Sequence, residues 1–135
     1  MRAIHTALAP APVAGAPYSQ AVAASGGEIV WVSGQVPVDV ATGALAAEDV
    51  AGQTAAALRN VAAILAAAGG GLRHVVKTTV FLTDLAADFP AMNAAYAEAF
   101  GDGRPARATV GVAALPLGAR VEIEAVAVIP EGITP

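Results

Sequence analysis

A single charged residue interrupts the apolar, strand-like run Pro105-Ala106-Arg107-Ala108-Thr109-Val110-Gly111-Val112. A guanidinium buried in such a run needs an anionic partner, because removing a charge from water is costly unless the charge is paired. The next strand-like run, residues 120–128, contains Glu122 and Glu124, which alternate with apolar residues and therefore share one face. Arg107 opposite such a carboxylate indicates a pocket for a small acid; the alternative is a structural ion pair.

Working outward, the sequence predicts three strands and a helix in this half of the chain. Residues 107–113 and 119–129 form the last two strands, and residues 74–82, rich in β-branched side chains, form a central strand. A helix joins the central strand to Arg107 and ends near residue 100, with Asp84 or Asp88 as its N-cap. Its inward stripe is expected to consist of Phe89, Asn93, Tyr96 and Phe100.

The first half of the chain predicts two further strands and a second helix. Residues 18–23 and 28–33 are apolar runs separated by Ser25-Gly26-Gly27, which favours an antiparallel hairpin. Residues 48–68 have apolar side chains at helical spacing, and Gly69-Gly70-Gly71 ends this helix. The glycine triplet is not a phosphate loop, because no Gly-Lys-Ser/Thr follows it.

The length and the order of the elements predict a single α+β domain over residues 1–135. In the order strand, strand, helix, strand, helix, strand, strand, both helices can cover one face of a mixed sheet. The other face is left bare. Hydrophobic residues make up 56% of the chain and charged residues only 13%, so we expect that bare face to be buried between subunits.

Composition also limits which partners and which cellular compartment we expect for this protein. The longest stretch without a charged residue, residues 3–27, is broken by three prolines, so we expect no membrane span and no targeting segment. The net charge is −4, and the seven basic residues are scattered along the sequence, which disfavours nucleic acid and anionic membranes as partners. The absence of cysteine fits a reducing compartment, and the cytoplasm is the expected location.

The chain offers few groups for metal or covalent catalysis. His5 and His74 are far apart in the sequence and no cysteine accompanies them, so neither a metal nor a cofactor is expected. There is no G-x-S-x-G motif, which leaves a hydrolytic triad unsupported. The remaining candidates can bind a ligand and orient water: Tyr18, Ser33, Asn93, Arg107, Thr109 and Glu122.

Several segments together resemble the Rid family of reactive-intermediate deaminases, also called YjgF-like proteins. They span nearly the whole chain and are Ala16-Pro17-Tyr18-Ser19-Gln20-Ala21, Val32-Ser33-Gly34-Gln35-Val36-Pro37, Met92-Asn93-Ala94-Ala95-Tyr96, Arg104-Pro105-Ala106-Arg107-Ala108-Thr109, Leu115-Pro116 and Val121-Glu122-Ile123-Glu124-Ala125. The resemblance implies a chorismate-mutase-like α+β fold, a homotrimer whose sheets form a central β-barrel, and pockets at the subunit interfaces.

The resemblance also implies an activity and a role for each candidate residue. The family is best known for hydrolysing 2-iminobutanoate, 2-iminopropanoate or their 2-aminoacrylate-type enamine tautomers to 2-oxo acids and ammonia. Arg107 would bind the substrate carboxylate, and Glu122 would position or deprotonate the attacking water. Tyr18, Ser33 and Asn93 would line the pocket. Thr109 stands where some members have cysteine, and Ala16 where glycine is common; neither change removes a required group.

Alternatives remain open from the sequence. A non-catalytic module of the same fold could use Arg107 to sense small carboxylates, and some relatives have been assigned ribonuclease or translation-inhibitor roles, which the acidic balance disfavours. Glu122 could instead be a structural carboxylate that bonds the backbone or Arg120. Glu124 is expected to be structural, since the resemblance assigns the water to the first glutamate of the pair.

Overall fold

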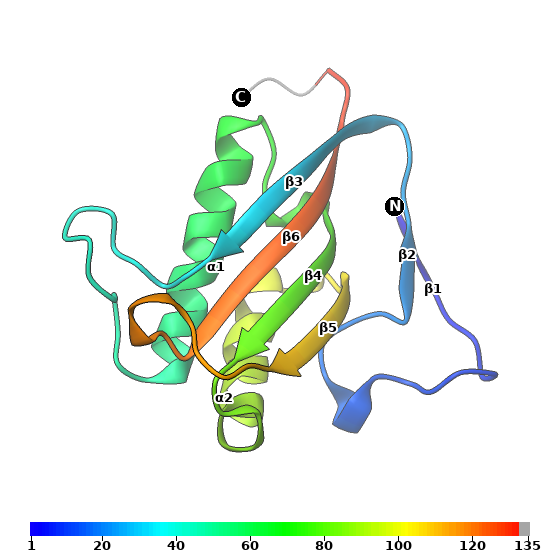
Figure 1. Ribbon diagram of the computed structural model, residues 1–135. Coiled ribbons are helices and arrows are strands. Elements are labelled where there is room, and N and C mark those ends of the chain that lie inside the picture. Colours follow the sequence, from blue (N-terminus) through cyan, green and yellow to red (C-terminus); the bar gives the residue numbers. More distant parts are fainter. Residues whose placement is uncertain (133–135) are drawn as a thin grey trace.

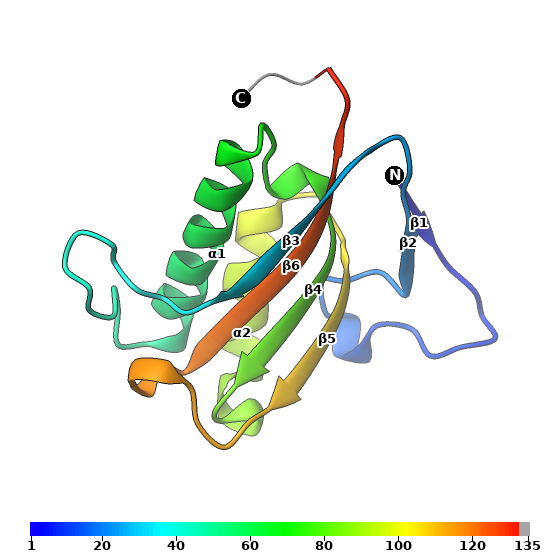
Figure 2. The same cartoon turned by 45° about the horizontal axis from the view of Figure 1, so that its top comes forward.

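The computed structural model describes residues 1–132 and contains a four-stranded sheet with both helices on one of its faces (Figures 1 and 2). The strands of the sheet lie in the order β3-β6-β4-β5, and only the β4/β5 pair is parallel. These elements are β3 (Gly27–Gln35), α1 (Val50–Ala67), β4 (Val75–Leu82), α2 (Leu85–Phe100), β5 (Ala106–Gly111) and β6 (Val121–Pro130). The predicted α+β class and the helices on a single face are therefore confirmed.

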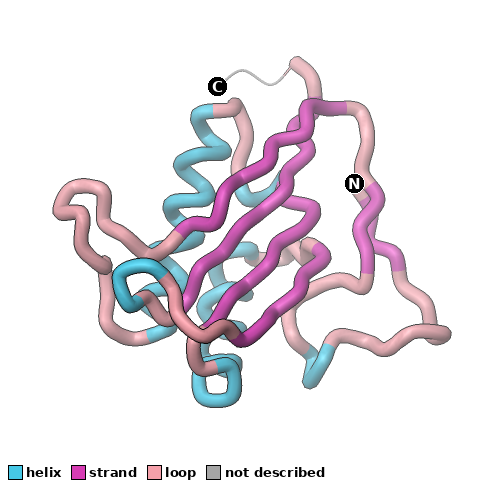
Figure 3. The backbone as a smooth tube through the Cα atoms, in the orientation of Figure 1, coloured by secondary structure: helices cyan, strands magenta, loops and turns pink. Residues whose placement is uncertain are grey.

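The N-terminal strand pairing was predicted wrongly. β2 (Ala21–Ala23) pairs with β1 (Arg2–Ile4) in a separate two-stranded ribbon, whereas β3 pairs along most of its length with β6 (Figure 3). β6, the longest strand, pairs with one edge of β3, and among the described residues the other edge of β3 stays unpaired because the regular part of β2 is only three residues long and is already paired with β1. The glycines after residue 25 therefore connect two sheets and do not close a hairpin.

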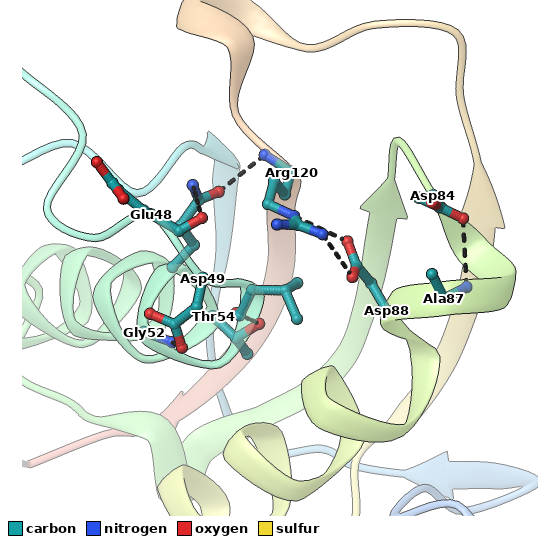
Figure 4. Close-up of polar contacts among 10 residues, drawn as sticks. Glu48, Asp49, Gly52, Thr54, Asp84, Ala87, Asp88 and Arg120 are labelled. Carbon is teal, nitrogen blue, oxygen red and sulfur yellow. Dashed lines mark hydrogen bonds and ion pairs between the residues drawn. The ribbon is translucent and has the colours of Figure 1, made fainter.

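Helix ends follow the chemistry of their capping residues (Figure 4). Asp49 accepts a hydrogen bond from the Gly52 amide at the start of α1, and Asp84 accepts one from the Ala87 amide at the start of α2. Asp84 is thus the N-cap of α2. Asp88 instead forms a bidentate ion pair with Arg120, with N–O distances of 2.9 and 3.1 Å.

The glycine triplet ends α1 as the sequence predicts. Gly69 has a φ of 86°, and the amides of Gly69 and Gly70 donate to the carbonyls of Ala66 and Leu65. This is the hydrogen-bond pattern of a Schellman motif. α1 is long and apolar enough to cross a bilayer by composition, but 44% of it is buried inside the protein, as in a core helix.

The core lies between the helices and the sheet. Its two clusters are formed by Val50, Ala57, Leu58, Val80, Leu82, Met92, Tyr96, Val121 and Ile123, and by Val32, Val61, Leu65, Val75, Ala125 and Ala127. The opposite face of the sheet carries no helix, and Ile29 and Trp31 on it are 53% and 75% exposed. Large apolar side chains exposed in this way favour contact with another protein surface.

Candidate functional site

Arg107 projects from the edge strand β5 toward the helices. Its register partner in β4 is Thr78, which is buried and bonded to α2, so both side chains lie on the helix-covered face. Arg107 is 8% exposed, and its three guanidinium nitrogens are buried. Within residues 1–132 none of these nitrogens has a hydrogen-bond partner. The fold therefore buries a permanent cation without an internal counter-ion.

Three aromatic rings surround this guanidinium. The distance from Cζ of Arg107 to the ring centroid is 4.8 Å for Tyr96, 5.0 Å for Tyr18 and 5.8 Å for Phe89. The Tyr96 hydroxyl is 2.7 Å from Oγ1 of Thr78, which fixes its ring, and the Tyr18 hydroxyl accepts a hydrogen bond from the Val13 amide. We call Tyr18, Phe89 and Tyr96 the aromatic cradle of Arg107.

The cradle stabilises the cation only in part. Burial lowers the pKa of Arg107, and the charges of the nearby Tyr96 and Tyr18 oppose that effect. Burial also raises the pKa of Tyr96 to about 12. Arg107 remains charged at neutral pH, since an arginine is not deprotonated in a protein. Desolvated cation–π contacts contribute about 2 kcal/mol, whereas burying an ion costs several kcal/mol. The rings also accept no in-plane hydrogen bonds, so the N–H groups at the edge of the guanidinium stay without acceptors in the described part of the chain.

Asn93 and Thr109 add two unsatisfied oxygens to the same region. Asn93 lies on the stripe of α2 that carries Phe89 and Tyr96, and Thr109 is two residues after Arg107 on the same sheet face. Oδ1 of Asn93 and Oγ1 of Thr109 are buried, and neither has a hydrogen-bond partner in the described part of the chain. Oδ1 of Asn93 therefore does not tether α2 to a neighbouring strand among residues 1–132. Buried polar atoms without partners are a feature of binding sites.

Glu122 and Ser33 lie on the other face of the sheet. Glu122 pairs with Phe81, three residues after Thr78, so its side chain points away from the helices. It lies against Gly34, where an added Cβ would be 2.8 Å from the Glu122 Cδ. Ser33 is exposed and lines a cavity of about 260 Å³ on this face, together with Trp31, Lys77, Thr79, Glu124 and Val126.

The predicted pairing of Arg107 with a glutamate in the same chain is therefore wrong. Glu122 and Glu124 do share one face, but it is the face opposite to that of Arg107. Arg120 does not pair with Glu122 either, because it is bonded to Asp88. The six candidates form two groups: Tyr18, Asn93, Arg107 and Thr109 on one side, and Ser33 and Glu122 on the other.

The sequence did not identify Phe89 and Tyr96 as neighbours of the arginine. It placed both on the inward stripe of α2, but the helical spacing alone gives no contact with a particular strand. The usable signal was the combination of Asn93 and two aromatic residues on that stripe with a lone arginine in the following strand. No group of three or more His, Asp or Glu side chains suited to a metal ion occurs among residues 1–132.

Comparisons with known proteins point to one family over most of the chain. The family model described as endoribonuclease L-PSP matches residues 8–129. The chain belongs to the Rid family. Among curated Rid-family relatives, human 2-iminobutanoate/2-iminopropanoate deaminase is 46% identical over 127 residues, covering 94% of this chain and 89% of the relative. A RutC family protein of Pyrococcus horikoshii is 46% identical, covering 92% and 94%.

Solved structures from the Rid family share this fold. RidA from an Antarctic Psychrobacter is 43% identical with a TM-score of 0.71, covering 96% of this chain and 100% of that one. TdcF of E. coli, solved with bound serine, is 39% identical with a TM-score of 0.70, covering 96% and 99%. The predicted family is thus confirmed, while its members are named for more than one activity.

Proposed function

We propose that this protein is a 2-iminobutanoate/2-iminopropanoate deaminase, which hydrolyses reactive imine and enamine acids to 2-oxo acids and ammonia. The observation that carries the proposal is the buried Arg107, whose guanidinium lies among three rings with no internal anion. A carboxylate ligand would supply the missing charge and accept two parallel N–H bonds. The human relative named as this deaminase adds independent support.

The active unit in this proposal is a cytoplasmic homotrimer with its sites between subunits. Arg107 and Glu122 cannot meet within one chain, because they lie on opposite faces of the sheet. In a closed ring of copies, the face of one chain that bears Glu122 can approach the Arg107 edge of the next. The exposed Ile29, Trp31 and Val110 on the bare face support such packing, which would bring the sheets of the three chains together in a central barrel.

The chemistry requires little beyond positioning and charge matching. Water adds to the electrophilic imine carbon while Glu122 of a neighbouring copy accepts one of its protons, and the same proton then passes to the nitrogen. The hydroxyl of the resulting carbinolamine then gives its proton to Glu122, which passes it to the amino nitrogen, so that the carbon–nitrogen bond breaks, ammonia leaves and the carbonyl of the 2-oxo acid forms. Arg107 holds the carboxylate, and Tyr18, Ser33, Asn93 and Thr109 shape the pocket. No redox step, metal or cofactor enters this sequence.

A coupled assay tests the proposal. An amino-acid oxidase generates 2-iminopropanoate, semicarbazide traps the imine that survives, and wild type is compared with Arg107→Ala. Wild type should suppress trapping, Arg107→Ala should not, and Arg59→Ala, which alters an exposed arginine on α1, should match wild type. Failure of wild type with this imine and with bulkier ones would contradict the deaminase assignment.

Two alternatives have distinct outcomes in the same set of measurements. A regulatory carboxylate-binding protein would bind a 2-oxo acid through Arg107 but leave imine trapping unchanged. A ribonuclease or translation inhibitor would bind RNA at physiological salt, which the net charge of −4 disfavours.

A further inference from the structure

Three arginines that are distant in the sequence meet around one cavity. Arg2 in β1, Arg73 in the turn before β4, and Arg104 after α2 line a cavity of about 370 Å³. They are three of the seven basic residues in the chain, which the sequence alone presents as scattered. The cavity lies at the end of α2, beside the N-terminal ribbon, and neither Arg107 nor Glu122 is among its lining residues.

The floor of this cavity is apolar. Val22, Leu72, Val75, Phe100 and Pro105 contribute to its lining, and Val75 and Pro105 are buried. The arginines themselves are exposed, so their charges lie at the rim. This arrangement suits an amphipathic anion, whose body displaces water from the floor while its charged head remains at the rim.

The geometry of the rim also bears on the chemistry of the head group. Arg104 is held in place because its Nη1 donates to the carbonyls of Gly101 and Gly103. Arg73 approaches from a different element, with Nη1 beside the backbone of Gly71. A planar carboxylate is matched by one two-pronged guanidinium, whereas a tetrahedral phosphate can accept hydrogen bonds from several directions.

One acidic side chain opposes this charge. Asp102 also lines the cavity, but among the described residues it forms no ion pair within 4.0 Å, since the only such pair there joins Arg120 and Asp88. The cavity therefore keeps a net positive charge from its side chains. Asp102 should weaken, and not assist, the binding of an anion.

We propose that this cavity binds a small phosphomonoester with an apolar body, at a site separate from Arg107 and its aromatic cradle. The proposal does not depend on the deaminase activity. Phenyl phosphate is the probe, because its ring fits the apolar floor and its dianionic head suits the three arginines. Inorganic phosphate measures the binding of the charged head alone, and phenol measures the binding of the ring alone.

Calorimetric titration of the full chain with phenyl phosphate tests the site. We expect saturable binding that is tighter than that of either inorganic phosphate or phenol. Arg73→Gln should weaken it roughly tenfold, and Asp102→Asn should strengthen it, since each change alters one charge at the rim. Arg59→Gln, an exposed arginine outside this cavity, is the matched control and should leave the dissociation constant unchanged.

A second comparison separates this cavity from the Arg107 pocket. Arg107→Ala should retain phenyl phosphate binding, because Arg107 does not line the cavity. Loss of binding in Arg107→Ala, equal weakening by Arg59→Gln and Arg73→Gln, or no saturable binding to wild type would each overturn the proposal. Binding of an RNA oligonucleotide in preference to phenyl phosphate would replace the small-molecule assignment with a nucleic-acid one.

Discussion

Arg107 and Glu122 project from opposite faces of the same four-stranded sheet. Arg107 pairs with Thr78, and Glu122 pairs with Phe81, an odd number of residues further along β4. Because side chains alternate between the faces of a sheet, no adjustment of rotamers within one chain can bring the guanidinium to the carboxylate. A reaction that needs both groups therefore requires a second copy of the chain.

Arg107→Lys tests whether the cation acts as a two-pronged clamp. Lysine keeps the charge but cannot make two parallel hydrogen bonds to a carboxylate, and its shorter, rounder head does not stack among three rings. We expect kcat/KM for imine hydrolysis to fall by about 100-fold, which corresponds to losing ~2.7 kcal/mol of charged hydrogen bonding. Near-normal efficiency in the lysine variant would show that charge alone suffices.

Tyr96 positions Arg107 through its ring, and two substitutions separate the ring from the hydroxyl. Tyr96→Phe keeps the π face that lies 4.8 Å from Cζ of Arg107 and loses the bond to Thr78. Tyr96→Leu loses both. We expect KM for the carboxylate substrate to stay within about threefold in Tyr96→Phe and to rise about tenfold in Tyr96→Leu, given the usual strength of a desolvated cation–π contact.

Tyr96 is also fully buried, so its packing role must be measured separately. Binding of a 2-oxo acid and of its uncharged amide to each Tyr96 variant distinguishes the two roles. A displaced guanidinium weakens binding of the acid alone, whereas a disturbed core weakens both ligands together. Equal losses for the acid and the amide would show that Tyr96 is a packing residue.

The sequence predicts local structure well and the site only in part, because its signals act over a few residues whereas the site depends on how distant strands pair. Helical and strand periodicity, together with the glycines after α1, identified most elements because these signals act within a few residues. Alternation shows which residues of one strand share a face, as for Glu122 and Glu124. It does not show whether two strands present their polar residues to the same side, because that depends on the register between them.

The gathered arginines and the N-terminal ribbon illustrate the same limit. Arg2, Arg73 and Arg104 meet only because the ribbon packs beside the end of α2. In the ribbon β2 pairs with β1, while β3 pairs with β6 in the main sheet. Such long-range choices depend on competition between strands for apolar partners, which a single run of residues does not reveal.

Gly34→Ala tests whether the position of the Glu122 carboxylate matters. A Cβ at residue 34 would be 2.8 Å from Cδ of Glu122, so the carboxylate must move while the backbone can remain in place. We expect kcat to fall by roughly tenfold or more with little change in melting temperature, as for a general base moved out of line. Glu122→Gln should keep the fold and slow hydrolysis in the same assay. Unchanged turnover in both variants would make Glu122 a structural carboxylate.

Mixing two inactive variants tests the arrangement of the site across subunits. Arg107→Ala and Glu122→Gln each remove one half of the proposed site, and in a co-expressed oligomer some interfaces would pair an intact Arg107 with an intact Glu122 from another chain. Random assembly should restore about a quarter of the sites, since each half is intact in half of the chains. Activity per restored site should then approach that of wild type, so the whole mixture should show about a quarter of the wild-type activity.

The control for this mixture is each variant purified alone and assayed at the same total concentration. Light scattering of the wild type should give the mass of three chains. A site contained within one chain cannot be rebuilt by mixing, so the mixture would show only the average of the two inactive proteins. That result, or a monomeric mass, would contradict the shared site, because the face of the sheet that carries Glu122 would then have no route to the guanidinium of Arg107.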